Sequence, residues 1–175
     1  MLRESRYSGR EKGISKDAED RQRKGQMIYR IRTAALSDEK RIRELFIEML
    51  RTIDPSKDHD GYPEGYLDRF LTGGEDRIYL AEDENVEAYL SAEVHHEMED
   101  YLYLDDFSVT EKYRSRGIGS ALIAAAEAYA GEIGIHNVLL HADKTNVSAI
   151  RFYEKRGYKI YRDEGHRYLM RKELE

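Results

Sequence analysis

The chain has 175 residues, no cysteine, and 29 basic against 35 acidic side chains, which gives a net charge of −6. Its length predicts one compact domain, and the lack of cysteine excludes disulfides, thiolate zinc sites and cysteine nucleophiles. No apolar stretch is long enough to span a bilayer, and the first residues contain no apolar signal segment. These features predict a soluble, cytoplasmic protein with no membrane partner.

Residues 1–26 differ from the rest of the chain in charge. They hold eight basic and five acidic side chains, a net charge of +3. Because the whole chain has a net charge of −6, residues 27–175 carry a net charge of −9. Few apolar side chains and no helical period occur in this segment, which is typical of a flexible charged extension. We therefore expect an extension over residues 1–26 and one domain over residues 27–175. Nucleic acid is not an expected partner, because acidic residues are interspersed among the basic ones.

The first part of the domain reads as a strand followed by two helices. Residues 28–33 alternate in polarity as a strand does. Ser37 is placed to cap a helix that ends at Asp54-Pro55. The apolar face of this helix consists of Ile42, Leu45, Phe46, Met49 and Leu50. A polar loop follows, and a shorter helix is predicted over residues 64–71, stopped by Gly73-Gly74.

The second part is predicted to alternate between strands and helices. Strands are expected over residues 77–82, 86–96 and 101–109, and the short turns between them favour antiparallel neighbours. A helix over residues 120–133, a strand over 137–142 and a helix over 146–156 come next, the last ending at Gly157. Two final strands are expected over residues 158–162 and 167–171. This order predicts a mixed α/β sheet and neither a repeat array nor a regular doubly wound fold.

A loop rich in glycine and arginine precedes the predicted helix 120–133. Gly117 and Gly119 let backbone N–H groups converge, and the helix N-terminus adds about half a positive charge. With Arg114 and Arg116 at the rim, the loop predicts an anion site suited to a pyrophosphate. A P-loop would need a lysine after Gly119, and a dinucleotide fingerprint would need a glycine or alanine where Leu122 stands. A glycine turn that only caps the helix remains the alternative.

Two segments of the chain resemble the GNAT superfamily of acyl-CoA-dependent N-acetyltransferases. In that family the loop has glutamine or arginine, then any two residues, then glycine, then any one residue, and then glycine or alanine. This chain is similar at Arg114, Gly117 and Gly119. A downstream run resembles its asparagine, alanine, phenylalanine-tyrosine and glycine-aromatic segment: Asn146, Ala149, Phe152, Tyr153, Glu154, Lys155, Gly157 and Tyr158. The resemblance covers about residues 27–171 and departs at Thr110-Glu111, where many members have a proline.

The resemblance implies the GNAT fold and its ligand. The fold is a central, mostly antiparallel sheet that splays between its fourth and fifth strands and is flanked by about four helices. Acetyl-CoA is the implied cosubstrate, and no metal is implied. The implied contacts of its pyrophosphate are Arg114, Ser115, Arg116, Gly117, Ile118, Gly119 and Ser120. Its pantetheine arm would pair with the strand edge at Phe107, Ser108 and Val109, and Asn146 and Tyr153 complete the implied site.

The resemblance also implies catalytic roles. Tyr153 stands where the family usually places the tyrosine that protonates the leaving thiolate. Asp105 occupies a frequent general-base position, acting directly or through water, with Asp106 as the alternative. Because neighbouring strand residues face opposite sides of a sheet, only one of the two is expected to face the substrate. The same reasoning argues against a metal site at His95-His96. His141 could reach the splay from the end of its strand, but we expect it to be a packing residue.

The implied activity is acetyl transfer to a primary amine of a small molecule or peptide. Transfer would be direct, in a ternary complex, because no cysteine is present to carry the acetyl group. The acidic balance of residues 27–175 would favour a cationic amine, and acceptor specificity would reside in the loop 53–65. A non-catalytic CoA-binding sensor is the alternative, and a homodimer stays open.

Overall fold

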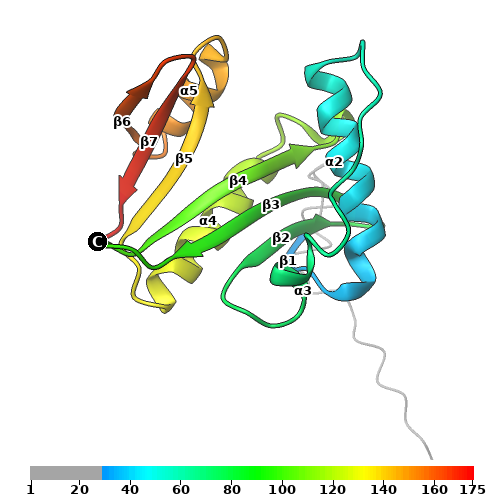
Figure 1. The fold of residues 1–175 in the computed structure, drawn as a ribbon, viewed down its shortest axis with the longest axis horizontal. Coiled ribbons are helices and arrows are strands. Elements are labelled where there is room, and N and C mark those ends of the chain that lie inside the picture. The colour runs from blue at the N-terminus through cyan, green and yellow to red at the C-terminus, as the bar shows by residue number, and fades with distance from the viewer. Residues whose placement is uncertain (1–28) are drawn as a thin grey trace, which may run out of the picture.

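The computed structural model describes residues 29–175 (Figure 1). One mixed sheet of seven strands has the order β1-β2-β3-β4-β5-β7-β6. The strands are β1 Arg30–Thr33, β2 Arg77–Glu82, β3 Val86–His95, β4 Tyr101–Val109, β5 Asn137–Asp143, β6 Lys159–Glu164 and β7 Arg167–Glu173. The helices are η1 Leu36–Asp38, α2 Glu39–Ile53, α3 Asp68–Leu71, η2 Glu111–Tyr113, α4 Ile118–Glu132 and α5 Val147–Glu154. The predicted extension, residues 1–26, lies outside the described residues.

Helices cover both faces of the sheet. One buried cluster joins the sheet to Leu122, Ile123 and Ala126 of α4, with residues of α5 packed against it. A second cluster joins the opposite face to Ile42 and Leu45 of α2 and to α3. Figure 1 shows α2 and α4 on opposite sides of the strands. Within residues 29–175, no helix combines the length and the apolar character needed to cross a membrane.

The strands β2, β3 and β4 form the antiparallel meander that the hairpin-length turns predicted. Alternation along β3 sends Ala88, Leu90 and Ala92 toward α4 and Tyr89 toward α2. Both faces of this strand are therefore buried, including the polar side chains of Ser91 and Glu93.

The sheet splays between β4 and β5. These parallel strands pair only where Tyr101–Leu104 lies beside Asn137–Leu140. Beyond that point β5 stays paired with β7, and Figure 1 shows β4 diverging from it. The edge of β4 that faces β5 is therefore unpaired from Asp105 onward. This arrangement confirms the predicted mixed sheet with a splay between its fourth and fifth strands.

Two local predictions are wrong. The second helix contains only Asp68–Leu71, because the preceding residues form turns in which Gly65 has a φ of +74°. Ser37 does not cap α2, since it lies in η1 and Asp38 is the N-cap residue. The carboxylate of Asp38 accepts a hydrogen bond from the N–H of Ala35 (2.8 Å) and pairs with Arg32 of β1 (2.7 Å). This ion pair between β1 and the start of α2 sets where the helix begins.

Candidate active site

A cavity of about 890 Å³ opens at the splay. It is bounded by the unpaired half of β4, the glycine loop, the first turn of α4, α5 and the C-terminal end of α2. The predicted site residues that line it are Asp105, Phe107, Ser108, Val109, Arg114, Ser115, Gly117, Ile118, Gly119, Ser120, Asn146 and Tyr153. Arg116 does not line it, and its guanidinium lies over the ring of Tyr113, 5.9 Å from the centroid.

The loop before α4 has an unusual backbone. Gly117 has a φ of +80°, and Ser115 has a φ of +60°, the only positive φ of a non-glycine residue in residues 29–175. A side chain in the left-handed region is strained, so such positions are held by the surrounding structure and occur often at ligand sites. Successive turns of this kind direct neighbouring N–H groups into one concavity that attracts anions.

The start of α4 offers free donors to that concavity. A helix leaves its first N–H groups without a backbone acceptor, and no side chain of the described residues caps α4 at Gly117. The N–H groups of Ile118, Gly119 and Ser120 are thus available to a ligand. A Cβ added at Gly119 would lie 2.7 Å from Cζ of Phe107 and 3.3 Å from Cζ of Phe152. Glycine at this position therefore lets the start of α4 pack closely against the rings of Phe107 and Phe152.

Arg114 stands at the mouth of the cavity. Its Nε donates to the carbonyl oxygen of Val109 at 3.0 Å, which fixes the side chain across the end of β4. The side chain is exposed, and its remaining N–H groups form no other hydrogen bond within residues 29–175. A guanidinium held in this way is suited to bind a phosphate oxygen.

A β-bulge places both predicted base candidates on one face of the sheet. Leu102 and Leu104 face α4, and the next residues of β4 that face it are Phe107 and Val109. Leu104 and Phe107 are three positions apart, whereas residues on one face of a regular strand are two apart. Asp105 and Asp106 together oppose Ser91 of β3, whose Oγ accepts the N–H of Asp106 at 2.8 Å. Strict alternation therefore fails here, because the extra residue of a bulge keeps two consecutive side chains on the same side. The expectation that only one of the two faces the substrate is wrong.

Asp106 is already engaged by a buried pair of tyrosines. The hydroxyl of Tyr62 donates to its carboxylate at 2.5 Å and lies 2.9 Å from the hydroxyl of Tyr89. Burial raises the pKa of Asp106 to about 6, the Tyr62 hydrogen bond opposes this rise, and the charges of Asp105 and Glu93 add to it. Tyr62 also stacks on Phe46, with ring centroids 3.9 Å apart. Asp106 thus anchors the loop between α2 and α3 to the bulge.

The raised pKa of Asp106 predicts a pH-dependent stability change. A carboxyl whose folded-state pKa rises from 3.8 to about 6 contributes stability below pH 3.8 that is lost as the pH rises through 6. Replacing it by asparagine removes the buried charge and keeps an acceptor for Tyr62. We expect Asp106→Asn to raise Tm by about 2–4 °C at pH 7.5 and by much less at pH 5, measured by thermal denaturation. The exposed Asp60→Asn is the control, and equal Tm shifts at both pH values would contradict the assignment.

Asp105 differs from Asp106 because its carboxylate forms no hydrogen bond within residues 29–175. Burial raises its pKa, while the charges of His141 and Arg167 act against that rise. It lines the same cavity as His141. Asp105 is therefore the carboxylate of the bulge that is left to accept a proton.

A chain of three polar groups ends beside Asp105 and was missed by the sequence reasoning. The hydroxyl of Tyr103 lies 2.7 Å from Nδ1 of His141, and Nε2 of His141 lies 2.8 Å from the carboxylate of Glu164. These residues come from β4, β5 and β6, so only the sheet order brings them together. His141 is more than a packing residue, because it lines the cavity and both nitrogens of its ring have a hydrogen-bond partner. Such an imidazole can accept or relay a proton.

Tyr153 and Asn146 project from the other wall of the splay. The ring of Tyr153 packs edge-on against Phe152 and Tyr158, with centroids 5.3 and 5.9 Å away. Burial raises its pKa to about 12, with the charge of Arg156 opposing the rise, so the phenol keeps its proton at neutral pH. The side-chain oxygen of Asn146 caps α5 by accepting the N–H of Ala149 at 3.1 Å. Its amide NH₂ forms no hydrogen bond within residues 29–175 and remains for a ligand.

The sequence reasoning also missed lining residues at the ends of α2 and α5. Met49, Thr52 and Ile53 reach the cavity from the end of α2. The sequence pattern could have identified them, because their helical spacing from Ile42 and Leu45 places them on the same face of the helix, one turn further on. Arg156 lines the cavity just after α5 and donates to the carbonyl oxygen of Phe152 at 2.6 Å. It follows the phenylalanine-tyrosine pair by one helical turn.

The described residues show no metal centre. Within residues 29–175, no group of three or more histidine or acidic side chains is placed to hold an ion. His95 stacks on Tyr101, with centroids 4.7 Å apart, whereas His96 pairs with Glu75 at 2.9 Å. The two neighbouring histidines thus have separate surroundings.

The fold and the cavity define a class of protein. In this class a cavity lies between two diverging strands, and here it is lined by the glycine loop, Asp105 and Tyr153. Residues 40–158 match the Acetyltransferase (GNAT) family. The chain therefore belongs to this family.

Several known proteins are similar to the chain. An L-ornithine N5-acetyltransferase of Arabidopsis thaliana is 33% identical over 61 residues, which are 35% of this chain and 27% of that protein. The PaiA N-acetyltransferase of Thermoplasma acidophilum, solved with coenzyme A, has a TM-score of 0.70 and 18% identity, covering 85% of this chain and all of that one. NAA60 of Arabidopsis thaliana, solved with a bisubstrate analogue, has a TM-score of 0.68 and 22% identity, covering 84% and 98%.

Proposed function

We propose that the chain transfers the acetyl group of acetyl-CoA to a primary amine in one direct step, within a ternary complex. The observation that carries this proposal is the unpaired edge of β4, which lies between the anion-binding loop and the acid–base groups Asp105 and Tyr153. A covalent acetyl-cysteine route is excluded because the chain has no cysteine. Residues 27–175 would form the catalytic domain.

The residues present fit coenzyme A along the length of the cavity. The N–H groups of Ile118, Gly119 and Ser120 would hold the pyrophosphate, with Arg114 at the rim. The free backbone edge of Phe107–Val109 would pair with the amides of the pantetheine arm, as an added strand does. When bound, acetyl-CoA supplies the thioester whose carbonyl is attacked. An N–H near Phe107 would donate to the oxygen of that carbonyl as negative charge develops on it.

The attacking nitrogen must be a neutral amine, so an ammonium group first loses one proton to solvent. The reaction then needs one further proton taken from the amine and one given to sulfur. The amine nitrogen forms a bond to the carbonyl carbon while the carbon–sulfur bond breaks. Asp105 would accept the proton from the amine, directly or through water, and the hydroxyl of Tyr153 would give its proton to the departing thiolate. The buried surroundings that raise the pKa of Tyr153 would also raise that of the thiol, so the transfer stays possible.

A cationic amine is the acceptor that the site favours. Asp105 and Asp106 face the same side of β4, and Glu93 on β3 is close enough to raise the pKa of Asp106. This grouping creates a negative potential, which attracts and orients a cation. The similarity to an L-ornithine N5-acetyltransferase agrees with this choice, because ornithine carries two amino groups.

An amine panel tests the proposal most directly. Purified protein with acetyl-CoA is mixed with diamines, polyamines, amino acids, aminoglycosides and short peptides, and the release of free thiol is measured. Turnover with at least one cationic amine is expected. Binding of CoA without turnover over the whole panel would favour the alternative of a non-catalytic CoA-binding sensor.

The role of Asp105 gives a kinetic prediction. We expect Asp105→Asn to lower kcat by about 10²-fold and to remove the acid limb of the kcat–pH profile, because that limb reports the ionisation of the base. Steady-state kinetics between pH 5 and pH 9 provide the measurement, with Asp100→Asn, in the exposed turn between β3 and β4, as the control. An unchanged acid limb would contradict this role and would move the proton acceptor to His141.

A further inference from the structure

Arg167, the first residue of β7, lies on the same side of the sheet as the base candidate Asp105. The pairing of β5 with β7 puts Arg167 opposite Asp143, two residues beyond His141. Residues directly opposite one another share a face of a sheet, and so do residues two apart along a strand. Arg167 is therefore on the face from which His141 lines the cavity. His141 in turn lies 2.7 Å from the hydroxyl of Tyr103, two positions before Asp105 on β4.

The guanidinium of Arg167 is available to a ligand. Its side chain is 44% exposed, and its one salt bridge within residues 29–175 joins Nε to the carboxylate of Glu164 at a distance of 3.8 Å. That carboxylate is already engaged by Nε2 of His141 at 2.8 Å. Arg167 forms no hydrogen bond within the same residues. The N–H groups of a guanidinium form a planar fork that fits a carboxylate, so an acceptor with such a group would find its partner here.

The positive charge of Arg167 also acts on the acid–base groups of the splay. Burial raises the pKa of Asp105 and that of Tyr103, and the charge of Arg167 opposes the rise in each case. Charges more than about 10 Å apart are largely screened in solution. Arg167 therefore lies near the point at which the amine would give up its proton. A carboxylate and a guanidinium at the same opening suit a molecule that carries both signs of charge.

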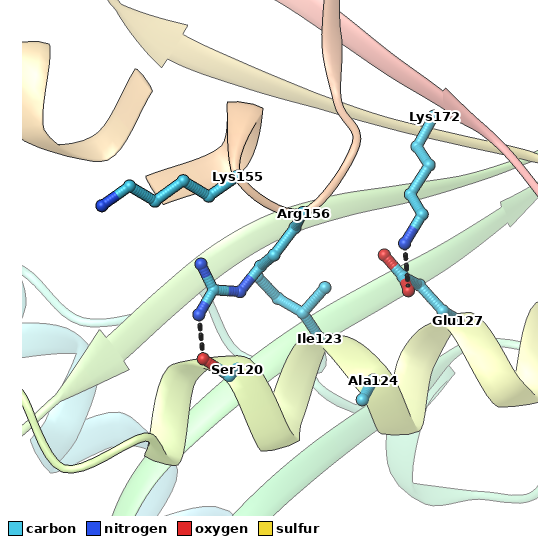
Figure 2. Close-up of a pocket in the computed structure, with 7 residues that line it drawn as sticks. All are labelled: Ser120, Ile123, Ala124, Glu127, Lys155, Arg156 and Lys172. Carbon is cyan, nitrogen blue, oxygen red and sulfur yellow. Dashed lines mark hydrogen bonds and ion pairs between the residues drawn. The ribbon is translucent and has the colours of Figure 1, made fainter. Parts of the chain in front are cut away.

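A second group of cations near the splay lies on the opposite face of the sheet. Figure 2 shows Lys155 and Arg156 at the end of α5, over the surface of α4, and Lys172 of β7 paired with Glu127 at 2.7 Å. These side chains surround a cavity on the α4 side. Arg167 faces away from α4, as the two carboxylates of the bulge do, and is thus a cation on the side of the acceptor.

We propose that Arg167 binds the carboxylate of an amino-acid acceptor whose side-chain amine is held at Asp105. The inference rests on the proposed function and narrows its acceptor from cationic amines in general to basic amino acids. The carboxylate would form charge-assisted hydrogen bonds to the guanidinium while the amine meets Asp105. A diamine of the same length would leave Arg167 without this partner and bring a second ammonium group toward it. Repulsion between these like charges adds to the discrimination.

The test compares L-ornithine with putrescine, which keeps both amino groups and the chain between them and lacks only the carboxylate. L-Lysine and cadaverine form a second such pair. Thiol release by the full chain should give a kcat/KM for each amino acid about tenfold or more above that for its diamine, as charge-assisted hydrogen bonds predict. Arg167→Gln should lower this ratio to less than about threefold through a higher KM for the amino acid, with kcat/KM for the diamine within about twofold of the wild type.

Arg162→Gln is the matched control. Arg162 contacts the same Glu164, at 3.6 Å, but stands on β6, one strand further from β5 than Arg167. This variant should keep the wild-type ratio.

The contradicting results separate the role of Arg167 from the proposed function. Equal kcat/KM values for amino acid and diamine in the wild type, or turnover of other amines but of neither amino acid, would overturn the role of Arg167 while the proposed acetyl transfer stands. An unchanged ratio in Arg167→Gln would do the same, whether the two rates stay at the wild-type level or fall together. No turnover with any amine of the panel would overturn the proposed function itself.

Discussion

Tyr153→Phe is expected to lower kcat by about 10²–10³-fold, in the range of general acid catalysis. The Kd for acetyl-CoA should change by less than about twofold, because removing the hydroxyl leaves the ring packed against Phe152 and Tyr158. The physical reason is that the departing thiolate then has no donor in a buried site. Thiol release with the best amine of the panel and calorimetry with acetyl-CoA measure the two quantities.

The control for this variant is Tyr161→Phe, which removes the hydroxyl of an exposed tyrosine on β6. It should match the wild type in both quantities. A kcat within about threefold of the wild type in Tyr153→Phe would remove the acid role, and the thiolate would then have to take its proton from water. A large loss of affinity with an unchanged kcat would make Tyr153 a binding residue only.

Gly117→Val is expected to weaken CoA binding by about 30-fold or more. The left-handed conformation costs an L-residue about 1–2 kcal/mol, and a β-branched side chain adds to this cost at the φ of +80° observed here. The strain would turn the N–H groups of the loop away from the pyrophosphate. Calorimetry with CoA measures the loss, and the residual kcat at saturating acetyl-CoA should fall much less than the affinity.

Gly131 offers a matched control in the same helix. A Cβ at this position meets no atom within 4 Å, and its φ is not positive. Gly131→Val should therefore keep the affinity for CoA within about twofold, since valine is a somewhat better helix former than glycine. Full CoA affinity in Gly117→Val would falsify the pyrophosphate assignment.

Much of the fold was predictable because its signals are local. The short turns at residues 83–85 and 97–100 required antiparallel neighbours, and β2, β3 and β4 form that meander. Gly157, predicted to end the helix before it, has a φ of +91°. The glycine loop and the segment from Asn146 to Tyr158 were visible as spaced residue types. The start of α2 was mispredicted because Arg32, in another element, draws in Asp38.

The parts of the site that sequence reasoning missed depend on register and on contacts between distant segments. The bulge at Asp105 and Asp106 arises from the pairing of β4 with β3, and alternation alone predicted the opposite orientation for one of the two. Tyr62 reaches Asp106 across 44 residues, and Glu164 reaches His141 across 23. Arg156 lies beside Ser120 only because α5 packs next to the start of α4.

Residue types and their spacing determine some properties of this protein, and the tertiary structure determines others. By itself the sequence determined that no cysteine is available, that a glycine loop precedes an alanine-rich helix, and that the chain belongs with the GNAT acetyltransferases, because these features are residue types at fixed spacing. Only the tertiary structure decided where the charges gather: carboxylates at the bulge of β4, and lysine and arginine between α4 and α5. A net charge of −6 does not say where individual charges lie, whereas the folded chain gathers these two groups in different places.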